Sequence, residues 1–177
     1  MKEIIFAGFG GQGVLTSGLL IGYTAMKNGF DVLWSPAYGG QQRGGKAYSI
    51  VKINRGMIAN PMMSKLDIVV AMNTPSLDFL RNLKPNGIAI ANSDVVPDDV
   101  SIQAARVYRI PMNSLAASAG GVKAANIVAV GAVIRALDMF DREESVNTMC
   151  RFFEDKGKGR FNDMNIKAFT AGYEAIC

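Results

Sequence analysis

The sequence has 177 residues, of which 49% are hydrophobic and 19% are charged, a composition that is ordinary for a globular domain and excludes a disordered chain. The formal charge of +4 comes from scattered lysines and arginines, so the chain lacks the concentrated basic block of a nucleic-acid binder. It has no histidine and only two cysteines, which excludes an imidazole base, a four-thiolate iron–sulfur cluster and a structural zinc site.

The remaining bulk features point to a cytoplasmic protein that does not enter a membrane. Cys150 and Cys177 are isolated thiols, which fits a reducing compartment. The opening segment, Met1 to Ala7, contains an acid and runs directly into glycines, so it predicts a strand and not a signal peptide. The longest apolar run, from Ile127 to Ile134, is too short to span a bilayer.

The first third of the chain alternates apolar runs with a helical pattern. A buried strand is expected over Glu3–Ala7, a helix over Val14–Asn28 that ends at Gly29, a second strand over Asp31–Ser35, a ten-residue loop over Pro36–Gly45, and a third strand around Tyr48–Ile53. A loop of this length inside a compact domain is often functional.

The same alternation continues to the end of the sequence. We expect strands over Leu66–Met72, Ile88–Ala91 and Arg106–Ile110, a helix from Thr74-Pro75 to about Leu83, a long apolar helix over Gly121–Asp138, and from Arg142 one or two amphipathic helices broken at Lys156–Gly159. Strands that alternate with helices predict an α/β fold, with a mostly parallel, Rossmann-like sheet and helices on both faces. Residues 1–177 are expected to form one domain, with 141–177 as its helical C-terminal extension.

The first glycine loop, Gly8-Phe9-Gly10-Gly11-Gln12-Gly13, fits G-x-G-x-x-G between a strand and a helix. Its backbone N–H groups and the helix dipole favour an anion, which can be a phosphate, a carboxylate or an acidic side chain of a partner. The alternative is that the glycines only allow the helix to pack closely on the sheet. A dinucleotide site is disfavoured, because the second strand ends at Trp34-Ser35-Pro36 without an acid and Asp31 lies at its other end.

The second glycine-rich loop contains Tyr38 and the run Arg43-Gly44-Gly45. A guanidinium on an adaptable backbone suits a carboxylate or a phosphate, although an exposed arginine in a loop needs no ligand. Four segments together resemble the gamma subunit of 2-oxoacid:ferredoxin oxidoreductases. They are Gly8-x-Gly10-Gly11-Gln12-Gly13-Val14, Pro36-x-Tyr38-Gly39, Arg43-Gly44-Gly45 and the later Asn126–Ala132. The family often has a proline and a glutamate where this chain has Gly40-Gln41-Gln42, so a charge-based role of that position is not carried over.

The resemblance implies a non-catalytic subunit of an enzyme that oxidatively decarboxylates a 2-oxoacid, such as pyruvate, 2-oxoglutarate or 2-oxoisovalerate, to its acyl-coenzyme A. In that family thiamine diphosphate lies between alpha and beta subunits, iron–sulfur clusters sit on beta or on a ferredoxin-like delta subunit, and ferredoxin accepts the electrons. No cofactor and no metal are expected in this chain, and none of its residues is expected to be catalytic. The anion or partner-contact residues would be Gly8, Gly10, Gly11, Gln12, Gly13, Tyr38, Arg43, Gly44 and Gly45. The alternative is a free-standing nucleotide- or anion-binding Rossmann-like module.

Two further features admit two interpretations each. Ala125, Ala129, Ala132 and Ala136 form a small-residue stripe on the long apolar helix, which indicates either burial within the domain or a subunit interface. Three methionines, at 57, 62 and 63, are either adaptable contact surface or loop anchors. The acids Asp67, Asp94, Asp98 and Asp99 are expected to be solvated at strand ends or in loops.

Overall fold

The fold was analysed in a computed structural model, which describes residues 1–39 and 45–176. Its strands are β1 (Lys2–Phe9), β2 (Asp31–Tyr38), β3 (Lys46–Asn54), β4 (Leu66–Ala71), β5 (Leu83–Asn92) and β6 (Arg106–Ile110). Its α-helices are α1 (Val14–Lys27), α2 (Met112–Ala119), α3 (Ala125–Leu137), α4 (Arg142–Glu154) and α5 (Asn162–Glu174). Three 3₁₀ segments complete the list: η1 (Thr74–Asn82), η2 (Val122–Ala124) and η3 (Gly159–Phe161).

The strands form one six-stranded sheet in the order β2-β3-β1-β4-β5-β6. Strands β1, β4, β5 and β6 are parallel neighbours, and β3 is antiparallel to both β1 and β2. The predicted α/β fold with a mostly parallel sheet is therefore confirmed. From β1 the chain continues through α1 to β2 on one side, whereas β4 leads to β5 and β6 on the other side. The carboxyl ends of β1 and β4 thus mark the point where the strand order reverses, which is where open α/β sheets usually bind ligands.

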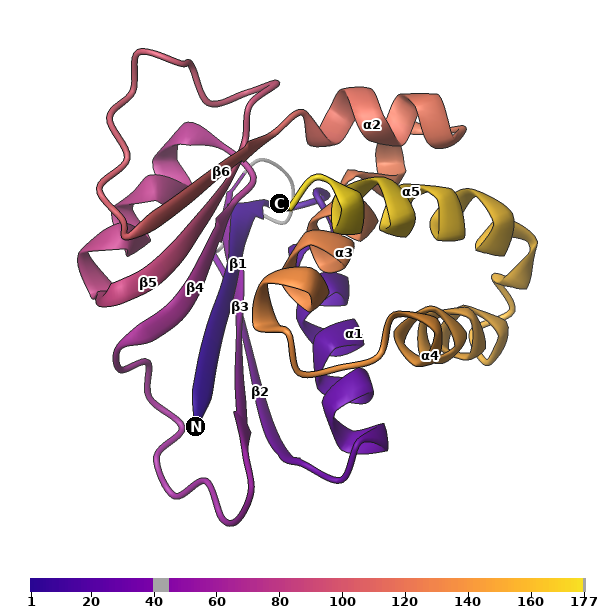
Figure 1. The fold of residues 1–177 in the computed structure, drawn as a ribbon, viewed down its shortest axis with the longest axis horizontal. Helices are drawn as coiled ribbons and strands as arrows, with labels where there is room; N and C mark the ends of the chain where they lie inside the picture. The colour runs from indigo at the N-terminus through magenta and orange to yellow at the C-terminus, as the bar shows by residue number, and fades with distance from the viewer. Residues whose placement is uncertain (40–44, 177) are drawn as a thin grey trace.

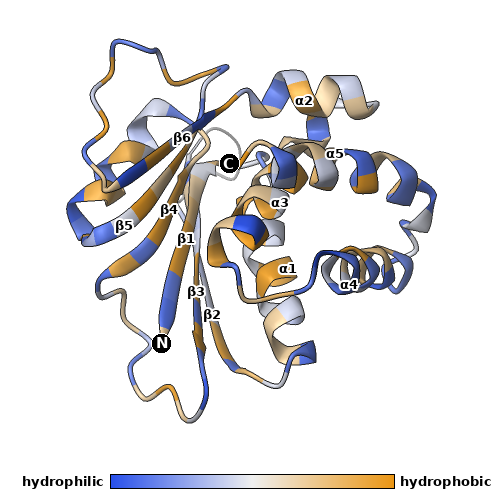
Figure 2. Ribbon diagram, viewed as in Figure 1, coloured by the Kyte–Doolittle hydropathy of each residue, from blue (hydrophilic) through white to orange (hydrophobic). Residues whose placement is uncertain are grey.

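The α-helices all lie on one side of the sheet in the part of the chain that the structure describes (Figure 1). There Ile4, Phe6 and Val70 belong to the large core, together with α1, α3 and α5. On the opposite side, Ile5, Ile50 and Val69 form a smaller cluster, covered by Phe79 and Leu80 of η1. The two faces are thus covered unequally, by α-helices on one and by a 3₁₀ segment on the other. Figure 2 shows that the central strands and α3 are largely hydrophobic.

Helix α3 is the centre of the helical layer. Its residues Ala129 and Ala132 are fully buried, and Gly131 and Gly172 allow the backbones of α3 and α5 to touch. A Cβ built on Gly131 would lie 2.0 Å from the Phe169 carbonyl oxygen, a distance that only glycine tolerates. Of the two interpretations of the small-residue stripe, the structure therefore shows burial within the domain.

Several predicted boundaries change in the structure. Strands β2 and β3 extend to Tyr38 and from Lys46, so the predicted loop over Pro36–Gly45 is shorter. The run Lys84-Pro85-Asn86-Gly87, expected to end a helix, belongs to β5, and the helix expected before it is the 3₁₀ segment η1. Helix α2 was not predicted, because its eight residues, MNSLAASA, carry few large apolar side chains and no capping residue. The C-terminal break is confirmed between α4 and α5.

Candidate functional site

The first glycine loop turns at the carboxyl end of β1 and leads into α1. Gly11 and Gly13 have φ angles of +98° and +76°, which side chains of L-residues rarely adopt. The Gln12 N–H donates to the Phe9 carbonyl oxygen over 3.1 Å and closes the turn. The pattern therefore predicts the position of this loop correctly, and two of its glycines are required by the backbone.

The Gln12 side chain ties this loop to the neighbouring strand β4. Its Oε1 accepts from the Phe9 N–H over 2.7 Å and from Asn73 Nδ2 over 3.2 Å, while its Nε2 donates to the Met72 carbonyl oxygen over 3.4 Å. Gly8 leaves room for it, because a Cβ there would lie 2.6 Å from Oε1. Asn73, which was not predicted as a site residue, also caps η1 through Ser76. Its place just before Thr74-Pro75, a helix start, is the sequence signal that would have found it.

The start of α1 is open to a ligand or a partner. Gly13 is its N-cap and has no side chain to accept from the first turn, so the first backbone N–H groups lack intrahelical partners. Together with the helix dipole they favour an anion by about 0.3–1 kcal/mol at an exposed site. Asn126 of α3 closes the other side, with its Nδ2 3.4 Å from the Gly13 carbonyl oxygen.

The two glycine loops are neighbours in space. The Gly10 N–H donates to the Gly45 carbonyl oxygen over 2.9 Å, which brings the end of the second loop beside the first. Tyr38 ends β2 with 70% of its surface exposed. Arg43 and Gly44, with residues 40–42, lie outside the described residues, so their predicted contacts stay predictions.

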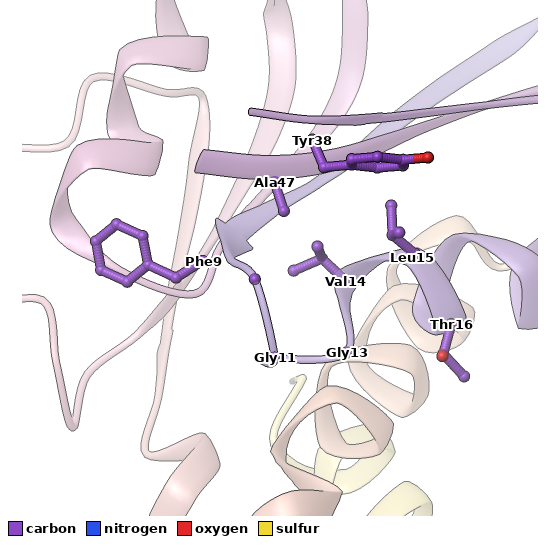
Figure 3. A pocket seen from close by; sticks show the side chains of 9 residues that line it. Phe9, Gly11, Gly13, Val14, Leu15, Thr16, Tyr38 and Ala47 are labelled. Carbon is purple, nitrogen blue, oxygen red and sulfur yellow. The ribbon is translucent and has the colours of Figure 1, made fainter. Parts of the chain in front are cut away.

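A cavity of about 500 Å³ lies between the two loops (Figure 3). Its lining residues are Phe9, Gly10, Gly11, Gly13, Val14, Leu15, Thr16, Tyr38 and Ala47. We call this the glycine-loop cavity. In Figure 3 Leu15 and Tyr38 approach each other on one side, and Thr16 projects from the other side of α1. Among the described residues of this lining, Tyr38 is the only titratable one, so these residues offer backbone N–H groups and apolar surface and no acid–base pair.

Comparison with known proteins agrees with this geometry. Residues 3–175 match the family model described as pyruvate ferredoxin/flavodoxin oxidoreductase. The chain belongs to this family. It is 31% identical to the 2-oxoglutarate synthase subunit KorC of Methanothermobacter thermautotrophicus, with 99% of this chain and 95% of that protein covered. It is also 36% identical to the ketoisovalerate oxidoreductase subunit VorA of that organism, of which it spans only 36% of the length.

A solved structure of similar length belongs to the same family. The gamma subunit of a keto/oxoacid ferredoxin oxidoreductase from Geobacter sulfurreducens PCA has a TM-score of 0.82 and 26% identity. The match covers 99% of this chain and 98% of that one. The family resemblance found in the two glycine loops is therefore confirmed over nearly the whole chain.

Dinucleotide binding of the Rossmann type does not fit this member of the family. Strand β3 is inserted between β1 and β2, so β2 does not pair with β1 as the second strand of a dinucleotide-binding βαβ unit does. Asp31 lies at the opposite end of β2, where it accepts from the Gly56 N–H over 2.8 Å. No acid therefore stands where a ribose would be bound.

The iron–sulfur clusters of such enzymes do not fit this chain either. Cys150, on α4, is the one cysteine in the described part, and no group of three or more Cys, Asp or Glu side chains there can hold a metal ion. Of the acids expected to be solvated, Asp94, Asp98 and Asp99 are exposed, whereas Asp67 is partly buried. Asp67 accepts from Lys84 Nζ over 2.8 Å, and Asp94 accepts from the Ser114 N–H over 2.8 Å.

The helices of the described residues include none that is both long and apolar enough to cross a bilayer.

Proposed function

We propose that this chain is the gamma subunit of a 2-oxoacid:ferredoxin oxidoreductase that converts a 2-oxoacid to its acyl-coenzyme A. The observation that carries the proposal is the match along nearly the whole chain to a gamma subunit of similar length. In this proposal thiamine diphosphate and the iron–sulfur clusters sit on alpha, beta and delta-type partners, because a chain with two cysteines and no histidine lacks the ligands for such clusters.

We further propose that the glycine-loop cavity faces these partners. Its open helix start suits a carboxylate of a partner subunit or the phosphates of coenzyme A, and exposed Tyr38 offers an aromatic contact at the mouth. Arg43 would add a guanidinium fork to the same face. This proposal gives the subunit a scaffold role, in which the loops set the position of groups that react elsewhere.

The test is co-expression of the tagged chain with candidate thiamine-binding and iron–sulfur subunits from the same genome. We expect the three kinds of subunit to co-purify with oxidoreductase activity. Tyr38→Glu should weaken assembly or raise the KM for coenzyme A about tenfold or more. The new carboxylate would either repel a bound anion or be buried against a partner subunit without a counter-charge, and each costs several kcal/mol. Met26→Glu is the matched control, since Met26 is 61% exposed on α1 and away from the cavity.

The outcomes separate the two parts of the proposal. Failure of all variants, including the unchanged chain, to associate with those subunits would contradict the gamma-subunit function. Normal assembly and normal KM for Tyr38→Glu, with a normal control, would leave the function standing and remove the contact role of the cavity.

A further inference from the structure

A second and larger cavity lies in the helical layer, beyond the start of α1. Its volume is about 640 Å³, within the usual range of small-molecule sites. We call it the helix-start cavity. It lies between the beginning of α1, the η2–α3 segment and the turn from α4 to α5, and its lining includes Lys123, Lys158, Asn165, Phe153, Phe161 and Met164. It shares only Gly13 and Thr16 with the glycine-loop cavity.

Three helices begin at this cavity, and none of them has a side-chain cap. Their N-cap residues are Gly13 for α1, Ala124 for α3 and Phe161 for α5, and no side-chain hydrogen bond satisfies any of these three starts. Helices α3 and α5 continue from η2 and η3, where the Ala125 N–H donates to the Val122 carbonyl oxygen and the Asn162 N–H donates to the Gly159 carbonyl oxygen. The start of α1 is therefore the open one of the three. Asp163 is the one acid in these first turns, and it is exposed and outside the lining.

Two lysines add positive charge at the mouth. Lys123 and Lys158 are both exposed residues of the lining, and neither takes part in an ion pair among the described residues. The two ammonium groups and the open start of α1 attract the same sign of charge. The mouth therefore favours an anion.

The buried amide of Asn165 is an independent observation that points to a ligand. Asn165 is 3% exposed and lines the cavity, and its side chain makes no hydrogen bond to another described residue. Its amide atoms are not among the fully buried unpaired atoms, so they open into the cavity. Buried polar side chains nearly always have a partner, because an unpaired amide loses its bonds to water without replacement. Around it Phe153, Phe161 and Met164 form an apolar wall.

We propose that the helix-start cavity binds a small organic acid, with one carboxylate on an aromatic or branched aliphatic body. The carboxylate lies between Lys123, Lys158 and the open start of α1. The body packs on Phe153, Phe161 and Met164, and a polar atom of the ligand pairs with Asn165. A single head group fits two lysines placed at one mouth, and the mostly apolar wall fits a compact body. This site goes beyond the proposed function, because apart from Gly13 and Thr16 its lining differs from that of the cavity given to the partner subunits.

The experiment uses the purified full chain, phenylpyruvate as the probe and isothermal titration calorimetry. We expect saturable binding that Lys123→Gln with Lys158→Gln weakens about tenfold or more, the effect of losing charge-assisted hydrogen bonds. Asn165→Asp keeps the shape of the side chain and introduces a negative charge, so it should abolish binding. Lys167→Gln is the matched control, because Lys167 is exposed on α5 and does not line the cavity.

The alternatives are tested in the same titration. Absence of phenylpyruvate binding, or equal binding by all the variants, would overturn the site. Inorganic phosphate that binds as tightly as phenylpyruvate would show that only the charged mouth is used, and tighter binding of ADP would show a nucleotide site; either result would overturn the proposed ligand class. Thermal unfolding of each variant checks the fold, and the double lysine variant carries the test if Asn165→Asp fails to fold.

Discussion

Gly11 and Gly13 both adopt positive φ angles, but their surroundings differ. A Cβ on Gly11 would meet no atom within 4 Å, whereas a Cβ on Gly13 would lie 2.7 Å from the Asn126 side chain. The first glycine is therefore required only by the backbone, and the second is required by the backbone and by the contact between α1 and α3. Substitutions at these two positions therefore distinguish the cost of backbone strain from the cost of a steric clash with Asn126.

We expect Gly11→Ala to lower the free energy of unfolding by about 1–3 kcal/mol, the usual cost of an L-residue in this conformation. Gly13→Ala should lower it by more, because the new methyl group must also displace Asn126. Urea unfolding of both variants measures the difference. Gly29→Ala is a control for strain alone, since Gly29 has φ +75° and open space around it. Equal losses at all three positions would show that the Asn126 contact carries no energy.

Cys150 lies on α4 with its thiol partly buried. Burial, and then the negative charges of Glu154 and Asp163, raise the pKa of its thiol above the usual 9.0. The folded protein thus holds this proton more tightly than the unfolded chain. The stabilising contribution of the thiol is complete below the usual pKa and is lost as the pH rises through the folded-state pKa.

Alkylation by iodoacetamide tests this shift, because the thiolate is the reactive form. In a Cys177→Ser variant, the alkylation rate at Cys150 should rise with pH, and the midpoint of this rise should lie at a higher pH than for a free thiol. Glu154→Gln should move that rise to lower pH, while Glu174→Gln, which changes the exposed partner of Arg142, should not. A pH profile equal to that of free cysteine would contradict the shift.

Elements with a strong hydrophobic pattern were predictable from the sequence, and those set by tertiary contacts were not. Strands β1, β4 and β6, helix α1 and the break between α4 and α5 lie where the apolar periodicity and the glycines indicate. Pro36 was expected in a loop, but β2 is an edge strand, where a missing N–H does not interrupt the sheet. The hairpin of β2 and β3 also depends on pairing that no local pattern reveals.

The candidate site was predictable to the same extent. The two glycine loops were found from their spacing, and Gly45 does lie beside Gly10. The amides that fix these loops, Asn73 and Asn126, are single residues without a repeating pattern, so their roles appear only when β4 and α3 are placed beside the loop. The helix-start cavity was missed for the same reason, since its parts come from three distant segments.

The segment from Arg55 to Lys65 is held against the sheet by a buried ion pair. Glu3 and Lys52 are partners across β1 and β3, each with a side chain 1% exposed, and their charged atoms lie 3.4 Å apart. Lys52 Nζ donates to the carbonyl oxygens of Asn60 and Met62 over 2.9 and 2.5 Å, and Glu3 Oε1 accepts from the Ser64 N–H over 2.8 Å. Of the three methionines there, Met57 and Met62 are exposed and Met63 packs on the smaller cluster.

Lys52→Met should lower the free energy of unfolding by about 3–5 kcal/mol, because it leaves the Glu3 carboxylate buried without its partner. It should also make the Arg55–Lys65 segment the first site of proteolysis, since two of its carbonyl groups lose their donor. Limited trypsin digestion and urea unfolding measure the two effects.

The double variant Glu3→Gln with Lys52→Met should be less destabilised than the sum of the single changes, as expected for a coupled pair. Lys46→Met is the control, because Lys46 pairs with Asp78 at the exposed surface, where such pairs contribute little. Additive losses in the double variant would show that the pair is not coupled.

In the whole molecule, the glycine-loop cavity lies at one end of the sheet, and the buried ion pair of Glu3 and Lys52 lies toward the other end. The glycine-loop cavity and the helix-start cavity both border the start of α1, at the carboxyl ends of the parallel strands. Three acids stabilise the fold through ion pairs or hydrogen bonds: Glu3, Asp67 and Asp94. This division suits a subunit that positions anions and partners and carries no reacting group of its own.

We therefore expect the purified chain to be colourless and to turn over no 2-oxoacid with a viologen acceptor. Its two cysteines are too few for a cluster, and the described residues that line the glycine-loop cavity include no base to act on a bound 2-oxoacid. Addition of the thiamine-binding and iron–sulfur subunits should restore turnover, and the unchanged absorbance of this chain before mixing is the control. Visible absorbance that persists after anaerobic desalting, or turnover by the isolated chain, would mean that a redox centre or a catalytic group resides here and that the scaffold role is wrong.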